Sequence, residues 1–292
     1  MIVSHIIGGL GNQMFQYAAG RALSLKLGVF LKLDVDDFGG YGLHQGFELD
    51  RLFAGKIELA SEADKQAVLG WQESRLIRRI VKKPALIFIR HKNYVVEPSF
   101  TYWDGINSLK GDVYLDGYWQ SEKYFYEFAA TIRADFAFKL PLSDQNIEIA
   151  SRISKVNAVS LHVRRGDYVS NKKTNTMHGV CSLDYYRDAI KHVLKRIESP
   201  VFFVFSDDIA WVRNNLSIDA ETVFVNHNAG KESYNDMRLM SLCQHHIIAN
   251  SSFSWWGAWL NSSENKIVIA PKKWFVNQSN IVDLFPSNWV TL

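Results

Sequence analysis

The chain has 292 residues, 47% hydrophobic and 22% charged, a globular composition with enough apolar material for two domains. Its net charge of +3 is too small for a general nucleic-acid binder, and its acidic and basic residues are interspersed. The two cysteines, Cys181 and Cys243, lie far apart in the sequence, which excludes a disulfide framework and a thiolate metal site.

The amino terminus turns glycine-rich after residue 7, which is too early for the apolar core of a signal peptide. No run of residues approaches the roughly 18 uncharged apolar positions of a membrane-spanning helix. We therefore expect a soluble cytoplasmic protein. Peripheral contact with the inner membrane stays open as an alternative, and so does the oligomeric state.

The first elements of the chain are a strand, a turn and a helix. Residues 3–7 predict a buried strand, residues 8–13 a glycine-rich turn, and residues 14–27 a helix whose apolar side chains recur at helical spacing. Residues 29–33 predict the next strand.

The middle of the chain, residues 61–139, is mostly helical in pattern. Its basic stretch at residues 75–83 predicts a solvated helix face. Trp103, Tyr118 and Trp119 have rings that could stack on a sugar, but aromatic side chains are more often core. We expect these three to be buried.

The second half of the chain alternates regularly between helices and strands. Apolar runs predict strands at residues 156–163, 201–205, 246–249 and 267–270. Amphipathic stretches predict helices between them at residues 183–197, 234–244 and 254–260. This alternation indicates a parallel sheet covered by helices, so the expected fold class is α/β. A polar, proline-bearing stretch near residue 142 divides the chain into domains 1–142 and 143–292.

A histidine and two arginines follow the first strand of the second half. His162 is separated by one residue from Arg164 and Arg165. Ligands of α/β sheets bind at carboxyl ends of strands, and a guanidinium offers a planar fork of donors that fits two phosphate oxygens. The pair therefore suggests a diphosphate ligand. In isolation, a solvated turn in which the arginines pair with Asp167 is the more frequent explanation.

A serine-rich turn precedes the helix expected at residues 254–260. Ser252 and Ser254 flank Phe253 at that point. A helix start presents free N–H groups and the positive end of the helix dipole, which receive phosphate without side-chain charge. The alternative is an ordinary helix cap followed by core tryptophans.

Three acidic positions at element ends allow two interpretations. Asp236 opens a helix, and its carboxylate can accept two hydrogen bonds from a guanine edge. Asp207 and Asp208 follow a strand and can approach a ribose. Aspartates at such positions are more often only helix caps.

The glycine-rich turn lacks the third glycine of a dinucleotide fingerprint. Gly11 is followed by the amides Asn12 and Gln13, which suit sugar hydroxyls better than phosphate. After the next strand, Asp34 and Asp36 form an acidic pair that could hold a divalent metal, although such pairs are frequent by chance.

Together, residues 8–18, 162–167 and 250–260 resemble, in order and spacing, the bacterial α-1,2-fucosyltransferases of glycosyltransferase family 11. The resemblance implies a two-domain GT-B fold. It also implies that the Rossmann-like carboxyl half binds GDP-fucose and the amino half faces the acceptor.

The resemblance carries roles to matching residues. Arg164 matches the catalytic arginine that grips the β-phosphate, and Asn12, the second catalytic candidate, an asparagine near fucose and acceptor. The substrate-binding candidates are His162 near the guanosine, Arg165 beside the catalytic arginine, Asp236 as guanine reader, Ser252, Phe253 and Ser254 at the pyrophosphate, and Gly11 and Gln13 in the glycine-rich turn.

The general base is open. The α-1,6 enzymes of the wider group carry a glutamate downstream of the arginine motif, where this chain has Asn-Lys-Lys at residues 171–173. Acceptor-side candidates are Asp36, Asp37, His44 and Glu48, each more often structural than catalytic.

The function implied is an inverting, metal-independent transfer of L-fucose from GDP-β-L-fucose to the 2-hydroxyl of a galactose-terminated oligosaccharide. No cofactor, metal or nucleic-acid partner is expected. Two alternatives remain: a dinucleotide-dependent oxidoreductase using the glycine-rich turn and Asp34, and a non-catalytic carbohydrate-binding protein whose tryptophans stack on glycans.

Overall fold

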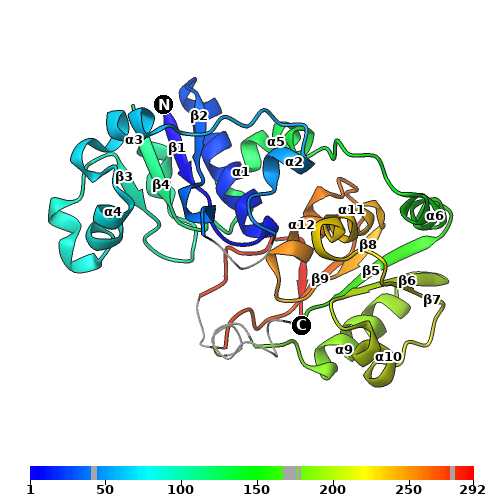
Figure 1. Cartoon of the computed structure of the whole chain (residues 1–292). Coiled ribbons are helices and arrows are strands. Elements are labelled where there is room, and N and C mark those ends of the chain that lie inside the picture. The colour runs from blue at the N-terminus through cyan, green and yellow to red at the C-terminus, as the bar shows by residue number, and fades with distance from the viewer. Residues whose placement is uncertain (41–44, 167–175, 177–178, 277–279) are drawn as a thin grey trace. The chain divides into compact units, whose positions relative to one another are not determined.

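The computed structural model describes residues 1–40, 45–166, 176, 179–276 and 280–292. The chain forms two compact units (Figure 1). Unit 1 comprises Met1–Leu140 and Ile281–Leu284, and unit 2 comprises Pro141–Asn280 and Phe285–Leu292. The expected division placed all of residues 143–292 in one domain, whereas residues 281–284 return to unit 1.

Polar contacts of Asp283 explain this return. Ser121 Oγ donates to the backbone oxygen of Asp283 (2.6 Å), and the backbone N–H of Tyr102 donates to its carboxylate (3.0 Å). Lys123 adds an ion pair. A short segment from the far end of the sequence is thereby fixed to unit 1.

Unit 1 contains a parallel four-stranded sheet in the order β2-β1-β4-β3. The strands are β1 (Ile2–His5), β2 (Leu31–Asp34), β3 (Tyr94–Val96) and β4 (Val113–Asp116). The expectation of a mostly helical middle is therefore wrong at β3 and β4. Each is too short to show a strand period, and pairing with a neighbouring strand decides its conformation.

The α-helices of unit 1 are α1 (Leu10–Leu27), α2 (Leu49–Leu52), α3 (Glu62–Leu69), α4 (Arg75–Val81) and α5 (Ala129–Asp135). Short 3₁₀ helices span Asp36–Phe38, Gly70–Gln72, Pro84–Ile89, Asp104–Ser108, Glu122–Tyr124 and Tyr126–Phe128. Helix α1 begins four residues before the predicted start, because Gly9 is an extended N-cap whose carbonyl accepts from the N–H groups of Asn12 and Gln13. It ends at Gly28, whose φ of 65° suits glycine.

Unit 2 contains a parallel six-stranded sheet in the order β10-β9-β8-β5-β6-β7. The strands are β5 (Asn157–Val163), β6 (Pro200–Ser206), β7 (Thr222–Val225), β8 (His245–Ile247), β9 (Val268–Ala270) and β10 (Val290–Thr291). The helices are α6 (Asp144–Ile153), α9 (Leu183–Leu194), α10 (Ile209–Asn215), α11 (Tyr234–Leu242) and α12 (Ser252–Leu260), with a 3₁₀ turn at Gly230–Glu232. The predicted alternation is confirmed, while β7, β10 and α10 had not been predicted.

The aromatic side chains divide between core and surface. The three tryptophans of α12 are buried and pack on one another, as their core interpretation requires. Trp119 is fully buried, Trp103 is half-buried, and Tyr118 is 45% exposed. The expectation that all three central aromatics are buried is therefore wrong for Tyr118.

Candidate functional site

In unit 2 the polar motifs gather at the carboxyl edge of the sheet. Strand β5 pairs with β6 on one side and β8 on the other, with Val163 opposite Ser206 and Leu161 opposite Ile247. The arginine motif leaves β5, the Asp207–Asp208 pair leaves β6, and the serine-rich turn follows β8. Three adjacent strands thus place these motifs together, as expected of parallel strands that end at one edge.

Both arginines meet the aspartates that follow β6. Arg164 Nη1 lies 2.9 Å from Asp207 Oδ2, and Arg165 Nε lies 3.4 Å from Asp208 Oδ2. The backbone N–H of Arg165 donates to Asp207 Oδ1 (2.8 Å). A Cβ on Gly166 would approach Asp207 Oδ2 to 2.7 Å, so a larger residue there would displace the Asp207 carboxylate. The pairing with Asp167 that the sequence allowed lies outside the described residues, and the partners found here are Asp207 and Asp208.

Arg165 is held more firmly than an exposed ion pair would hold it. Its guanidinium lies 3.7 Å from the centre of the Trp211 ring, and Asp208 caps α10 by accepting from the Trp211 N–H (3.1 Å). These contacts fix Arg165 against α10. Arg164 keeps a side chain that is 28% exposed beside a partly exposed Asp207.

His162 is a buried, neutral imidazole. Burial lowers its pKa to about 4; the nearby Arg164 acts in the same direction, and Asp207 opposes it. Its Nδ1 has no hydrogen-bond partner among the described residues, although its ring lies 6.0 Å from that of Phe253. A buried polar atom without a partner at a strand end is a place where a ligand can bond.

The serine-rich turn starts α12 without a side-chain cap. Ser251 is the N-cap residue but accepts no cap bond, and the first turn has no acidic residue. Ser254 is fully buried and donates to the Ser251 carbonyl (3.2 Å). The first N–H groups of a helix lack intrahelical partners, so an anion is the complementary ligand for this start.

Asp236 lies in the first turn of α11 but does not cap it with its side chain. Its carboxylate accepts from Asn228 Nδ2 (2.8 Å), and burial raises its pKa to about 7. The capping alternative is therefore wrong for Asp236.

The glycine-rich turn lies in unit 1 and its two amides differ. Gln13 is fully buried; its Nε2 donates to the carbonyls of Gly8 and Gly46, and its Oε1 accepts from the Glu48 N–H. These bonds shape the turn, and the expected contact of Gln13 with substrate stays a prediction. Asn12 is half-buried and accepts from Gln120 Nε2 (2.7 Å), and Gly11 is buried in α1.

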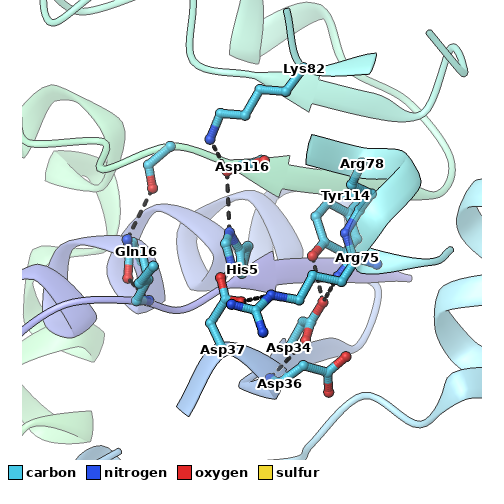
Figure 2. Close-up of polar contacts among 12 residues, drawn as sticks. His5, Gln16, Asp34, Asp36, Asp37, Arg75, Arg78, Lys82, Tyr114 and Asp116 are labelled. Carbon is cyan, nitrogen blue, oxygen red and sulfur yellow. Dashed lines mark hydrogen bonds and ion pairs between the residues drawn. The ribbon is translucent and has the colours of Figure 1, made fainter. Parts of the chain in front are cut away.

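Unit 1 also contains a pocket of about 380 Å³ that the sequence did not predict. His5, at the end of β1, lies between Asp37 (2.9 Å) and Asp116 (3.2 Å) (Figure 2). Burial alone would lower the pKa of His5, but the hydrogen bonds to both carboxylates outweigh it and raise the pKa to about 9. His5 is therefore a cation at neutral pH.

One face of α4 lines this pocket. Arg78 pairs with the fully buried Asp34 (2.8 Å), and Lys82, just beyond the helix, pairs with Asp116 (2.7 Å). Arg75 pairs with Asp37. The expectation that residues 75–83 form a solvated face is wrong for this side, because buried carboxylates at the strand ends need cationic partners.

Most of the acidic candidates for a metal ligand, a ribose contact or a general base pair with other side chains of the protein. Asp34 accepts from the Tyr114 hydroxyl and from Arg78, and Asp36 pairs with Lys65. Asp37 pairs with His5, and Glu48, whose pKa burial raises, pairs with Arg51. His44, Asp167 and residues 171–173 lie outside the described residues.

Glu97 is a pocket residue that sequence reasoning missed. Burial raises its pKa to about 7, although the N–H groups of Tyr118 (2.7 Å) and Trp119 (3.0 Å) donate to its carboxylate and oppose the rise. A strand assignment for Tyr94–Val96 would have placed it at the carboxyl edge of the sheet.

Within the described ranges, no three His, Cys, Asp or Glu side chains are grouped to hold a metal ion. No helix in the described part of the chain is long and apolar enough to cross a membrane.

Comparison with known proteins adds three findings. The model of the family "Glycosyl transferase family 11" matches residues 89–292. An alpha-1,2-colitosyltransferase of Escherichia coli is 40% identical over 295 residues, covering 100% of this chain and 99% of that protein. Galactoside 2-alpha-L-fucosyltransferase SEC1 of Bos taurus is 30% identical over 154 residues, covering 51% and 42%.

Among solved structures, the alpha-1,6-fucosyltransferase NodZ soaked with GDP-fucose matches with a TM-score of 0.51 at 14% identity. The match covers 89% of this chain and 91% of that one. The likeness is in the fold, which is of the GT-B type with parallel, Rossmann-like sheets.

Proposed function

The chain belongs to glycosyltransferase family 11, and from this premise we propose that it transfers L-fucose, with inversion, from GDP-β-L-fucose to the 2-hydroxyl of a galactoside. The observation that carries the proposal is the meeting of the arginine motif and the serine-rich helix start on adjacent strands β5 and β8. Membership of a transferase family leaves no support for the oxidoreductase or the non-catalytic binder.

The donor diphosphate is proposed to lie between Arg164 and the start of α12. As the glycosidic bond breaks, negative charge grows on the β-phosphate, and preorganised donors stabilise that charge more than they stabilise the ground state. Arg164 now pairs with Asp207, so the phosphate would take the place of a partly exposed carboxylate. Arg165 is proposed to hold the turn through Trp211.

The guanosine is proposed to contact His162 and Asp236. The base presents N–H donors along one edge, and an ionised carboxylate accepts two of them. The neutral His162 offers the unpartnered Nδ1. Ser252, Phe253 and Ser254 complete the donor site through the α12 start, with Phe253 beside His162.

We also propose that the transfer needs no metal ion. Arg164 and the α12 amides supply the positive charge that a divalent cation would otherwise bring to the diphosphate. Added chelator should leave turnover unchanged, and restoration of lost activity by Mg²⁺ or Mn²⁺ would disprove this part.

Unit 1 is proposed to bind the acceptor, with Asn12 near the reacting sugars. Its pocket suits a polyhydroxylated ligand, because charged donors and acceptors stand beside the half-exposed ring of Tyr118. Glu97 is our candidate base, since a carboxylate with a pKa near 7 is poised to accept a proton at neutral pH.

Glu97→Gln tests this role. Loss of a base removes the rise in kcat/KM through about pH 7, whereas loss of the Glu97 contacts to the Tyr118–Trp119 backbone lowers the melting temperature. An unchanged pH–rate profile would leave Glu97 with a structural role only.

A second donor is favoured by one finding, the 40% identity to a colitosyltransferase over the whole chain. Colitose is L-fucose without its 3-hydroxyl group. A site that hydrogen-bonds this hydroxyl rejects the deoxy sugar by about 10⁴-fold, and a site without such a contact accepts both. The ratio of kcat/KM for GDP-fucose and GDP-colitose decides between the two donors.

The decisive experiment incubates the protein with GDP-fucose and lactose and measures released GDP and trisaccharide. Formation of an α-1,2 linkage, identified by NMR, is the expected result. Failure with every galactoside and both GDP-sugars would overturn the proposal. We place the enzyme in the cytoplasm, with peripheral contact at the inner membrane.

A further inference from the structure

An apolar segment between α4 and β3 has no buried residue. Pro84–Ile89, with the sequence Pro-Ala-Leu-Ile-Phe-Ile, forms a 3₁₀ helix with every side chain at least partly accessible. Ile87 is 65% and Phe88 79% exposed. Scattered exposed apolar residues are ordinary, but a contiguous group of them marks an interaction surface.

The neighbouring elements extend this surface. Leu76 and Ile80 lie one turn apart on α4 and are 70% and 53% exposed, and Trp71 in the preceding 3₁₀ turn is 61% exposed. Helix α4 contacts both 3₁₀ segments, so these side chains belong to one region. We define the apolar patch as Trp71, Leu76, Ile80, Ile87, Phe88 and Ile89.

Hydrogen bonds at the carboxyl end of the segment hold it in place. The fully buried Gln72 donates to the carbonyl of Ile89 (2.7 Å) and accepts from the N–H of His91 (2.9 Å). Arg90 donates to the carbonyls of Val81 (3.2 Å) and Lys82 (3.0 Å) at the end of α4. The exposure of the patch is therefore built into the fold.

Cations accompany the patch. Residues 71–92 contain seven lysines and arginines and a single acidic residue, Glu73. Three of the cations pair with Asp37, Asp34 and Asp116. Arg79, Lys83 and Lys92 are exposed and make no ion pair with any residue that the structure describes. Exposed apolar side chains among unpaired cations complement an anionic lipid surface.

We propose that the apolar patch, with Lys83 and Lys92, docks the protein on an anionic phospholipid bilayer. The aliphatic and aromatic side chains would enter the boundary between headgroups and acyl chains, while the lysines reach the phosphates. A second copy of the chain is a poorer occupant, because a two-fold interface would bring the same unpaired cations face to face. The inference rests on the peripheral contact proposed above and gives it a location.

Vesicle flotation of the full chain tests the proposal. The wild type should bind phosphatidylcholine vesicles containing about 30% phosphatidylglycerol far better than phosphatidylcholine alone, and less at about 0.5 M than at about 0.1 M NaCl. Ile87→Ser/Phe88→Ser should abolish binding. Phe30→Ser, at a side chain that is 76% exposed outside the patch, should not.

A matched pair of double variants tests how much the lysines contribute to vesicle binding. Lys83→Gln/Lys92→Gln should weaken binding about 25-fold, since each cation near an anionic surface contributes about fivefold. Lys110→Gln/Lys155→Gln removes the same charge from exposed positions elsewhere and should have a much smaller effect.

Two results would overturn the proposal: no preference of the wild type for anionic vesicles, or a wild-type dimer that Ile87→Ser/Phe88→Ser converts to a monomer in light scattering. Sugar transfer to lactose is measured in parallel. Transfer without vesicle binding defeats this inference and leaves the enzymatic proposal intact, and vesicle binding without transfer does the reverse.

Discussion

The carboxyl edges of the two sheets both pair cations with carboxylates, but they differ in the polar groups that have no described partner. In unit 1, His5, Arg78 and Lys82 are each matched by a carboxylate at a strand end, so the protein neutralises its own charges. In unit 2, the start of α12 has no side-chain cap and His162 leaves an atom without a described partner. Loss of a charge partner should therefore destabilise unit 1, whereas the groups of unit 2 that have no described partner are available to a ligand.

The largest effect is expected when one member of a buried ion pair in unit 1 is removed. Arg78→Met leaves Asp34, which is fully buried, without its cation and should lower the free energy of unfolding by about 3–5 kcal/mol in urea denaturation. Arg187→Met, which removes an exposed ion pair with Asp184, should cost less than about 1 kcal/mol. Equal losses would mean that burial does not separate the two pairs.

In unit 2 the corresponding loss should appear in catalysis. Arg164→Ala and Arg164→Lys should each lower kcat about 10²- to 10³-fold, because lysine lacks the planar fork. Arg152→Ala, at an exposed ion pair with Glu221, serves as the control and should change kcat by less than about twofold. Near wild-type turnover in either Arg164 variant would refute its role.

The pH dependence of stability tests the charge pairing of His5 in unit 1. The pKa of His5 is raised to about 9 in the fold from an ordinary value of 6.5. Its stabilisation is therefore complete below pH 6.5 and lost as the pH rises through 9, by on the order of 3 kcal/mol. Urea denaturation of the wild type and His5→Gln should give curves that converge across this window. Parallel curves would show that the folded imidazole does not titrate there.

The smallest expected effect is the pH dependence of GDP binding in unit 2. Burial raises the pKa of Asp236 to about 7, and only its ionised form can accept hydrogen bonds on both oxygens from the N–H groups of guanine. Affinity measured by calorimetry should therefore fall about tenfold per pH unit below 7. Asp236→Asn should remove this dependence. A wild-type affinity that stays constant between pH 5 and pH 8 would exclude Asp236 as the guanine reader.

The sequence predicted a strand correctly where a long apolar run is compatible only with a buried strand. Strand β6 is continuously apolar up to Ser206, so both its position and the polar residues at its end were predictable. Strand β4 has four residues and finishes on Asp116, and only pairing between β1 and β3 makes it a strand. Because β3 and β4 were missed, Glu97 and Asp116 could not be placed at a sheet edge.

Side-chain engagement was the other limit. Nothing in the local sequence distinguishes Asn12 from Gln13, yet only Gln13 is enclosed by the backbone of Gly8, Gly46 and Glu48. Gly46 and Glu48, whose backbone groups bond the Gln13 amide, lie more than thirty positions away in the sequence. Contacts of that range are a property of the fold and not of the motif.

The attachment of residues 281–284 to unit 1 has a consequence for protein engineering. A chimaera that exchanges everything after residue 140 with a homologue would also replace Asp283, and Ser121 and Lys123 would then face a foreign residue. A truncation after residue 280 would remove residues from both units. A chimaera that exchanges unit 2 alone therefore needs three junctions, after residues 140, 280 and 284, so that residues 281–284 stay those of the recipient.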